Sequence, residues 1–473
     1  MPVTFTHAIM NNMKVIQIHK LLIFILAISF FYNPAFAQLE EDYRPIELKG
    51  EIPADFLKRI KGDIKLQYRN SLRLNSAQKE QFRIATEYTL RDIFQQGNIY
   101  FNDPMTDYVR KVGNRILYGT ELANEITFFV SSYNSTNATT WQDGTIIVNI
   151  GLLSRLENEA QLAFALAHEI SHFIQQHPYL QYGRFIKKQQ AINKNEAFIQ
   201  NIDRTLDYEL EADSIAINLL RRTNYNYNEG SKVLGIIRGE YERNTIGFGN
   251  YLSSKKFTIE EHHLCRPISY RDYMEDESVS SKSVLSIDIR HKKLINRLSK
   301  IEYKSGSKTH ILSVKLFRSI KLIAHFELVE QAFRTSNYLR SIYEVLALLN
   351  DYPNNKYLNI KVSENLYYIN SYNDLSIMNR IFFDEKKIDD DVYADFCCFI
   401  NRLTKDDMHK MVFGFVQKQY KTYPSEERML IIMAKTVEAI YDMKYAKSYY
   451  EIYVKLYREG EHFLMAKKKL EGS

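Results

Sequence analysis

Apolar residues recur at helical spacing along most of this chain, and only short stretches show strand-like character. Residues 38–96 mix charged and apolar positions in this way and predict helices that precede or pack onto the main body. A further helix is expected to begin at Asp103-Pro104, because an aspartate cap followed by proline is typical of helix N-termini. The pattern predicts a mainly helical protein with a small β-component.

A predicted helix follows Asn158 and contains neither glycine nor proline up to His172. His168 and His172 are four residues apart, so their side chains lie over one another on a helix and both imidazoles can bind one metal ion. Glu169 lies beside them and can reach a water on that metal. This H-E-x-x-H pattern is typical of zinc proteases, in which the glutamate accepts a proton. A pattern with two free positions also arises by chance, so it needs support from the rest of the chain.

A second predicted helix carries Glu209 and Asp213, again four residues apart. Alone, an acidic helix face is usually solvated surface. Downstream of H-E-x-x-H, one acid can complete a two-histidine, one-carboxylate zinc site that keeps an open position. The other can accept the remaining N–H of a metal-bound imidazole.

Two β-like runs precede the histidine helix, at residues 125–130 and 145–150, with a polar loop and the Asp143-Gly144 turn between them. The second run leads directly toward that helix. Its residues Thr145, Ile146, Ile147, Val148 and Asn149 could pair with an extended peptide and hold it across the site. An ordinary core strand is the alternative.

Composition narrows the class of protein. At 473 residues two to three domains are expected, and 45% hydrophobic residues indicate folded material throughout. The formal net charge of +6 falls to +4 without the first 37 residues, which is a mildly basic surface. Nucleic-acid binding is disfavoured because no basic block with interleaved aromatic residues occurs.

The N-terminus has the pattern of an export signal. Lys14 and Lys20 precede an apolar run at residues 21–28, and Ala35-Phe36-Ala37 then forms an A-x-A site. We expect cleavage after Ala37 and a periplasmic protein. An uncleaved membrane anchor is the alternative, although the apolar run is shorter than the roughly 20 residues of a span.

Three cysteines, Cys265, Cys397 and Cys398, are too few and wrongly spaced for a disulfide framework. The adjacent pair lies in an apolar run and is expected to be small buried hydrophobes.

Residues 97–297 resemble the HtpX/BepA-like family of zinc metalloproteases, which is related to the CAAX prenyl protease and Oma peptidases. The resemblance is carried by Asn137-Ala138, Gly151-Leu152-Leu153, Asn158-Glu159, Leu166-Ala167-His168-Glu169, His172, His177 and Glu209-Leu210-Glu211-Ala212-Asp213. It implies that Glu209 is the third zinc ligand, that Asp213 supports a ligand, and that the strand at 145–150 holds substrate backbone. His177 takes the family's extra histidine position. Nine residues beyond His168 on a continuous helix, it is expected to face away from the metal and to be structural.

A later segment resembles the family's T-H-P motif, which is followed by an arginine six residues after the histidine. His291 and Arg297 keep that spacing, and Lys292 replaces the proline. The resemblance implies that His291 is a regulatory or transient fourth zinc ligand. An exposed histidine in a basic helix is the alternative, and His262-His263 is a rival pair.

Residues 313–473 are predicted to be entirely helical. Their packing positions suggest repeats of the tetratricopeptide type, since Ser341 and Ala446 lie 105 residues apart, near three periods of about 34 residues. A non-repetitive helical bundle is the alternative. Such repeats bind peptides or proteins on a concave surface.

We therefore predict an α+β fold. A signal peptide (1–37) is followed by a helical extension (38–96), by a mainly helical zincin-like metallopeptidase domain with a small sheet (97–300), and by an all-α repeat domain (313–473). The predicted function is a periplasmic endopeptidase with one Zn²⁺ per chain, acting on envelope proteins in quality control. Envelope or outer-membrane assembly proteins are the expected partners of the repeats. The alternatives are an envelope chaperone or scaffold with latent proteolysis, and a secreted protease.

Overall fold

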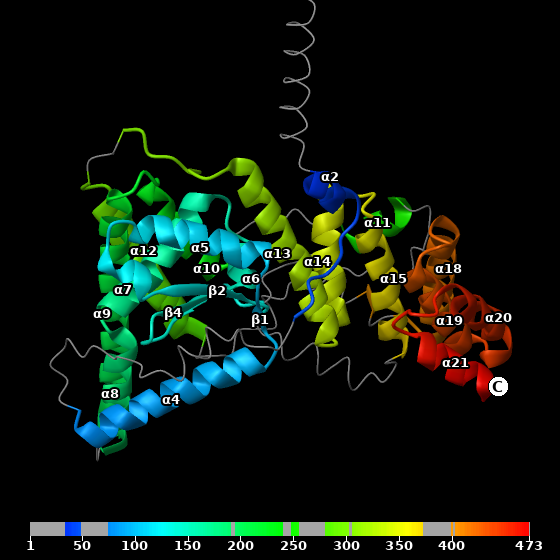
Figure 1. The fold of residues 1–473 in the computed structure, drawn as a ribbon, viewed down its shortest axis with the longest axis horizontal. Coiled ribbons are helices and arrows are strands. Elements are labelled where there is room, and N and C mark those ends of the chain that lie inside the picture. Colours follow the sequence, from blue (N-terminus) through cyan, green and yellow to red (C-terminus); the bar gives the residue numbers. More distant parts are fainter. Residues whose placement is uncertain are drawn as a thin grey trace, which may run out of the picture.

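The computed structural model describes residues 34–48, 74–190, 194–239, 247–254, 280–301, 305–371, 399–400 and 403–472. Residues 1–33 of the expected signal peptide, His262-His263 and all three cysteines lie outside this part of the chain. Within it, a four-stranded sheet with surrounding helices is followed by an all-helical region (Figure 1). This arrangement confirms the expected fold class.

The sheet has the order β1-β2-β4-β3. Its strands are β1 (Ile99–Tyr100), β2 (Thr127–Ser131), β3 (Ala138–Thr140) and β4 (Thr145–Asn149). Strands β2 and β4 are parallel, with Phe129 opposite Ile147, whereas β1 and β3 run antiparallel to their neighbours. The sheet therefore ends in β3, which has a described partner on one side only.

Successive side chains of a strand point to opposite faces of the sheet, and here both faces are apolar. Phe128 and Val148 belong to the core shared with α5 (Pro104–Leu117) and α7 (Glu159–Ile174). Phe129 and Ile147 point to the opposite face and pack with Leu90 of α4 (Ser76–Gln95). Helix α4 thus covers the second face and runs along the lower side of the sheet in Figure 1.

Helix α7 is the centre of the first core, with every residue from Glu159 to His172 buried. Asn158 caps it by accepting a hydrogen bond from the backbone N–H of Gln161. The helices around it are α6 (Ile150–Leu153), α8 (His177–Gln190), α9 (Lys194–Arg221), α10 (Gly230–Arg238) and α12 (Ser280–Leu298). Helix α9 packs along α7, which places the two helices with candidate ligands side by side.

The second core belongs to the C-terminal helices. They are α13 (Val314–Arg334), α14 (Tyr338–Asp351), α15 (Lys356–Ser371), α18 (Lys405–Thr422), α19 (Glu427–Ile440), α20 (Met443–Leu456) and α21 (Phe463–Glu471), joined by α2 (Pro34–Glu41) and α11 (Phe248–Ser254). Ser341 and Ala446 are fully buried between these helices. Helices that follow one another in the chain pack together, while the tetratricopeptide assignment stays a prediction.

Helix α13 links the two cores. Phe317 and Ile320 pack into the first core, whereas Phe326 and Val329 pack into the second. Between them, the buried Glu327 carboxylate accepts hydrogen bonds from Tyr43 Oη at 2.6 Å and Tyr100 Oη at 2.9 Å. Because these residues come from the N-terminal segment, β1 and α13, one carboxylate ties three distant parts of the chain together.

Among the described residues, no helix combines the length and apolar character that a membrane span requires.

Candidate metal centre

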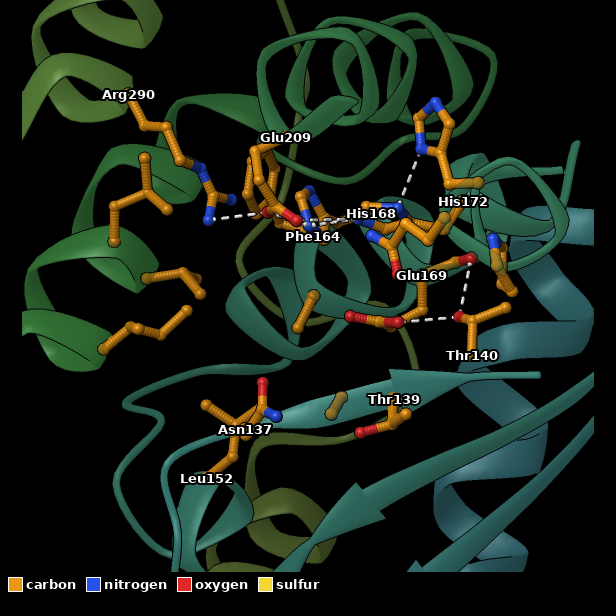
Figure 2. Close-up of a pocket in the computed structure, with 18 residues that line it drawn as sticks. Asn137, Thr139, Thr140, Leu152, Phe164, His168, Glu169, His172, Glu209 and Arg290 are labelled. Atoms are coloured by element: carbon orange, nitrogen blue, oxygen red, sulfur yellow. Dashed lines mark hydrogen bonds and ion pairs between the residues drawn. The ribbon is translucent and has the colours of Figure 1, made fainter. Parts of the chain in front are cut away.

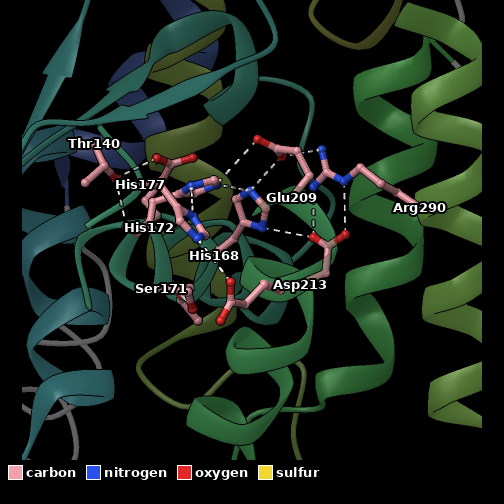
Figure 3. A network of polar contacts seen from close by, with 11 residues as sticks. Thr140, His168, Ser171, His172, His177, Glu209, Asp213 and Arg290 are labelled. Carbon is pink, nitrogen blue, oxygen red and sulfur yellow. Dashed lines mark hydrogen bonds and ion pairs between the residues drawn. The ribbon is translucent and has the colours of Figure 1, made fainter. Parts of the chain in front are cut away.

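Three side chains from two helices converge on one point. His168 and His172 come from α7 and Glu209 from α9, and one donor atom of each lies within 4.8 Å of the others. The two Nε2 atoms are 3.0 Å apart, and they lie 3.3 and 3.6 Å from the Glu209 oxygens (Figure 3). Ligands about 2.0–2.1 Å from zinc at tetrahedral corners are about 3.3 Å apart. The donor set therefore fits a zinc ion.

Asp213 determines which nitrogen of His168 faces this point. Its Oδ1 lies 2.9 Å from His168 Nδ1, so Asp213 can accept the Nδ1–H and leave the Nε2 lone pair toward Glu209. Burial opposes a charge on His168, yet the carboxylates of Asp213 and Glu209 raise its pKa to about 10. Binding of a metal at Nε2 would therefore release a proton.

His172 is in a different electrostatic position. Burial, together with the neighbouring His168, lowers the pKa of His172 to about 3, so its imidazole is neutral. Its Nδ1 lies 2.8 Å from Nδ1 of His177. The expectation that His177 faces away was wrong, because α7 ends at Ile174 and a left-handed Gln176 (φ 58°) turns the chain back before α8 begins.

Glu169 lies next to the three donors and borders the same cavity of about 270 Å³ (Figure 2). Burial raises the pKa of its carboxyl. The Thr140 hydroxyl lies 2.6 Å from Glu169 Oε2 and 2.8 Å from the Glu169 backbone oxygen. Thr140 was not predicted from the sequence as a site residue, and its contact fixes the orientation of the carboxylate.

The strand expected to hold substrate backbone lies inside the sheet and is paired on both sides. Thr145, Ile146, Ile147, Val148 and Asn149 form β4, which pairs with β2 on one side and β3 on the other, so its backbone groups are already used. Strand β3 instead borders the cavity.

The register of β3 shows which of its groups face outward. Trp141 N–H donates to Thr145, and Asn149 N–H donates to Asn137. In an antiparallel pair the hydrogen-bonded positions alternate, so Ala138 and Thr140 direct their N–H and C=O groups away from β4. An extended peptide could pair with these groups beside Glu169.

Arg290 reaches the centre from α12, where the sequence suggested His291. Its Nη1 lies 2.8 Å from Glu209 Oε2, and its Nε and Nη2 bind Asp213 at 3.0 and 2.8 Å. His291 is absent from both the donor set and the cavity lining found among the described residues.

Helical phase explains the difference. Arg290 shares a face with the buried Leu294, whereas His291 is four residues before Ile295, which is 48% exposed. Neighbouring positions on a helix differ by about 100°. The apolar periodicity of this helix therefore indicates that Arg290 lies on its buried face, whereas the motif spacing pointed to His291.

Residues 105–262 match the model described as peptidase family M48. This stretch is similar to an M48 peptidase domain. This range contains His168, His172 and Glu209 and ends before Arg290. The resemblance expected from the sequence is thus confirmed, and it supports the metallopeptidase class.

Curated relatives match a shorter stretch. The Beta-barrel assembly-enhancing protease of Escherichia coli (strain K12) is 33% identical over 78 residues, which is 16% of each chain. The protein of that name from Yersinia pestis is 26% identical over 92 residues, 19% of each chain. A putative one from Vibrio cholerae is 31% identical over 78 residues. The chain therefore covers less than a fifth of the length of these relatives.

Proposed function

We propose that this protein is a zinc-dependent endopeptidase, with His168, His172 and Glu209 as the metal ligands. The observation that carries the proposal is the separation of 3.0–3.6 Å between donor atoms of these residues, with Glu169 beside them. Zinc held there would polarise the scissile carbonyl and lower the pKa of the attacking water.

The chain's own groups supply the remaining steps. The Glu169 carboxylate accepts a proton from the attacking water and passes it to the nitrogen of the leaving amine. The Thr140 hydroxyl holds this carboxylate at 2.6 Å. The outward backbone groups of Ala138 and Thr140 bind the substrate as an added antiparallel strand, which favours unfolded or extended segments over compact domains.

The physiological role that we propose is quality control of envelope proteins in the periplasm. It is supported by the export signal expected at residues 1–37 and by relatives named Beta-barrel assembly-enhancing protease. In this proposal the helices from α13 to α21 bind envelope or outer-membrane assembly proteins and bring them to the peptidase domain.

Comparison of the wild-type chain from Gln38 onward with Glu169→Gln tests the catalytic part. Both are loaded with zinc and incubated with a reduced, carboxymethylated protein as the unfolded substrate, and peptides are identified by mass spectrometry. We expect cleavage by the wild type and a loss of at least about 100-fold in the variant, which is the usual contribution of a general base. Equal cleavage by both proteins would refute the proposal.

A further inference from the structure

The contact between His172 and His177 requires one particular arrangement of protons. The two Nδ1 atoms are 2.8 Å apart, and His177 is only 1% exposed. Of two neutral imidazoles at this distance, one must donate and the other must accept. The direction of this hydrogen bond determines which nitrogen of His172 has a free lone pair.

The proposed function sets this direction, and the inference rests on it. If His172 binds zinc through Nε2, its proton is on Nδ1 and is donated to His177 Nδ1. His177 then carries its own proton on Nε2, which lies 3.4 Å from Glu211 Oε2. We propose that His177 is a positioning residue that holds His172 in the metal-binding tautomer, with Glu211 at the outer end of the chain of contacts.

This arrangement matches the one at the other histidine. Asp213 lies 2.9 Å from Nδ1 of His168, just as His177 lies 2.8 Å from Nδ1 of His172. Each imidazole therefore has a second side chain within 3 Å of its Nδ1, which leaves Nε2 for the metal. The two partners differ in chemistry, since one is a carboxylate and the other is a neutral imidazole (Figure 3).

The surroundings of His177 fix its ring. Its plane stacks on Tyr208 of α9 with ring centroids 4.3 Å apart and an interplanar angle of 17°. The guanidinium carbon of Arg184 lies 4.0 Å from the centroid of the same tyrosine. His177 is also the first residue of α8, directly after the left-handed Gln176. The turn and the stack together direct Nδ1 toward His172.

Three variants separate hydrogen bonding from packing. In His177→Asn, the amide oxygen stands where Nδ1 was and can accept the proton from His172. In His177→Gln, the terminal amide reaches the position of Nε2, near Glu211, and leaves His172 without its partner. In His177→Phe, the ring still stacks on Tyr208 but has no acceptor. All three are made in the Glu169→Gln background, so that self-cleavage cannot affect the result.

The main measurement is zinc affinity, by competition with a chromophoric chelator. We expect His177→Asn to bind zinc within about threefold of the parent, and His177→Gln and His177→Phe to bind about 10- to 100-fold more weakly. The visible spectrum of the Co²⁺-loaded proteins should change in the last two variants only. Thermal unfolding of the metal-free proteins reports packing separately.

A different order of affinities would overturn the inference. If His177 acts through packing alone, His177→Phe keeps the parent affinity and His177→Asn loses it. Equal affinities in all variants would also overturn the positioning role. The readout does not depend on proteolysis: if the wild-type protein binds zinc but cleaves nothing, the proposed function fails while the order of affinities still decides the role of His177.

Discussion

The Arg290 guanidinium lies 2.8 Å from the Glu209 carboxylate and holds Asp213 with two further hydrogen bonds. Arg290 is 8% exposed and neutralises two acids, of which Asp213 is buried and Glu209 is half-buried. Removing one partner of a buried ion pair leaves an uncompensated charge and costs about 3–5 kcal/mol. The segment at α12 is therefore coupled to the candidate centre through charge.

We expect Arg290→Met to lower the free energy of unfolding of the metal-free protein by about 3 kcal/mol, with a smaller loss in Arg290→Lys, which keeps the charge but not the paired geometry. Urea unfolding followed by circular dichroism in the presence of a chelator measures the effect. Arg297→Met is the matched control, because Arg297 is an exposed arginine on the same helix. A loss in the control equal to that in Arg290→Met would contradict this assignment.

His291→Ala should leave zinc affinity and proteolysis unchanged, since the half-buried His291 lies outside the donor set and outside the cavity lining of the described residues. The motif resemblance implies the opposite, namely higher basal proteolysis after loss of a fourth ligand. Initial rates on the unfolded substrate, with and without the substitution, distinguish the two. An increase would restore His291 as a regulatory ligand.

Thr140→Val should lower kcat by about 10-fold while zinc affinity stays the same, because valine has the shape of threonine but cannot donate to Glu169. Thr140→Ser keeps the hydroxyl and should retain most of the activity. Steady-state kinetics with a peptide found in the unfolded-substrate digest, combined with chelator competition, measure both quantities. If the serine variant is as impaired as the valine variant, the threonine acts through its methyl group and not through its hydrogen bond.

The helical region should lose stability in acid. Although burial opposes ionisation of Glu364, the cations of Arg428 and Lys361 lower its pKa to about 2 from an ordinary value of 4.5. The Arg428 Nε to Glu364 Oε1 distance is 2.7 Å. The stabilisation is therefore fully present above about pH 4.5 and is lost as the pH falls toward 2.

The measurement is the urea midpoint at several pH values between 3 and 7 in the wild type and in Glu364→Gln. The variant is less stable at neutral pH, and its midpoint should fall less steeply below pH 4.5 because the linked proton uptake is gone. Parallel pH profiles in the two proteins would show that Glu364 does not control this transition.

The sequence predicts best what a single helix determines. The four-residue spacing of His168 and His172, and of Glu209 and Asp213, already placed each pair on one face of a helix. The two pairs meet because α9 packs along α7. This packing depends on contacts between distant parts of the chain, and only the resemblance indicated it. Their role as ligands and partner remains our proposal.

The errors have local physical causes. Strand β3 is only three residues long, and its extended form depends on pairing with β4, so Ala138-Thr139-Thr140 gave no strand signal of its own. The expected position of His177 assumes that α7 continues past Ile174. The chain instead turns at Gln176, whose positive φ is not marked by a glycine in the sequence. Thr140 and Arg290 were missed because their contacts join residues 29 and more than 70 positions apart.

Zinc K-edge X-ray absorption of the zinc-loaded Glu169→Gln protein tests whether His168, His172 and Glu209 hold the metal. We expect one zinc per chain with two imidazole nitrogens and oxygen ligands at about 2.0–2.2 Å. Glu209→Gln should weaken binding, whereas Asp207→Asn, which changes an exposed acid on the same helix, should leave the two-imidazole signal intact. A first shell with sulfur, with three imidazoles or with no imidazole would contradict it.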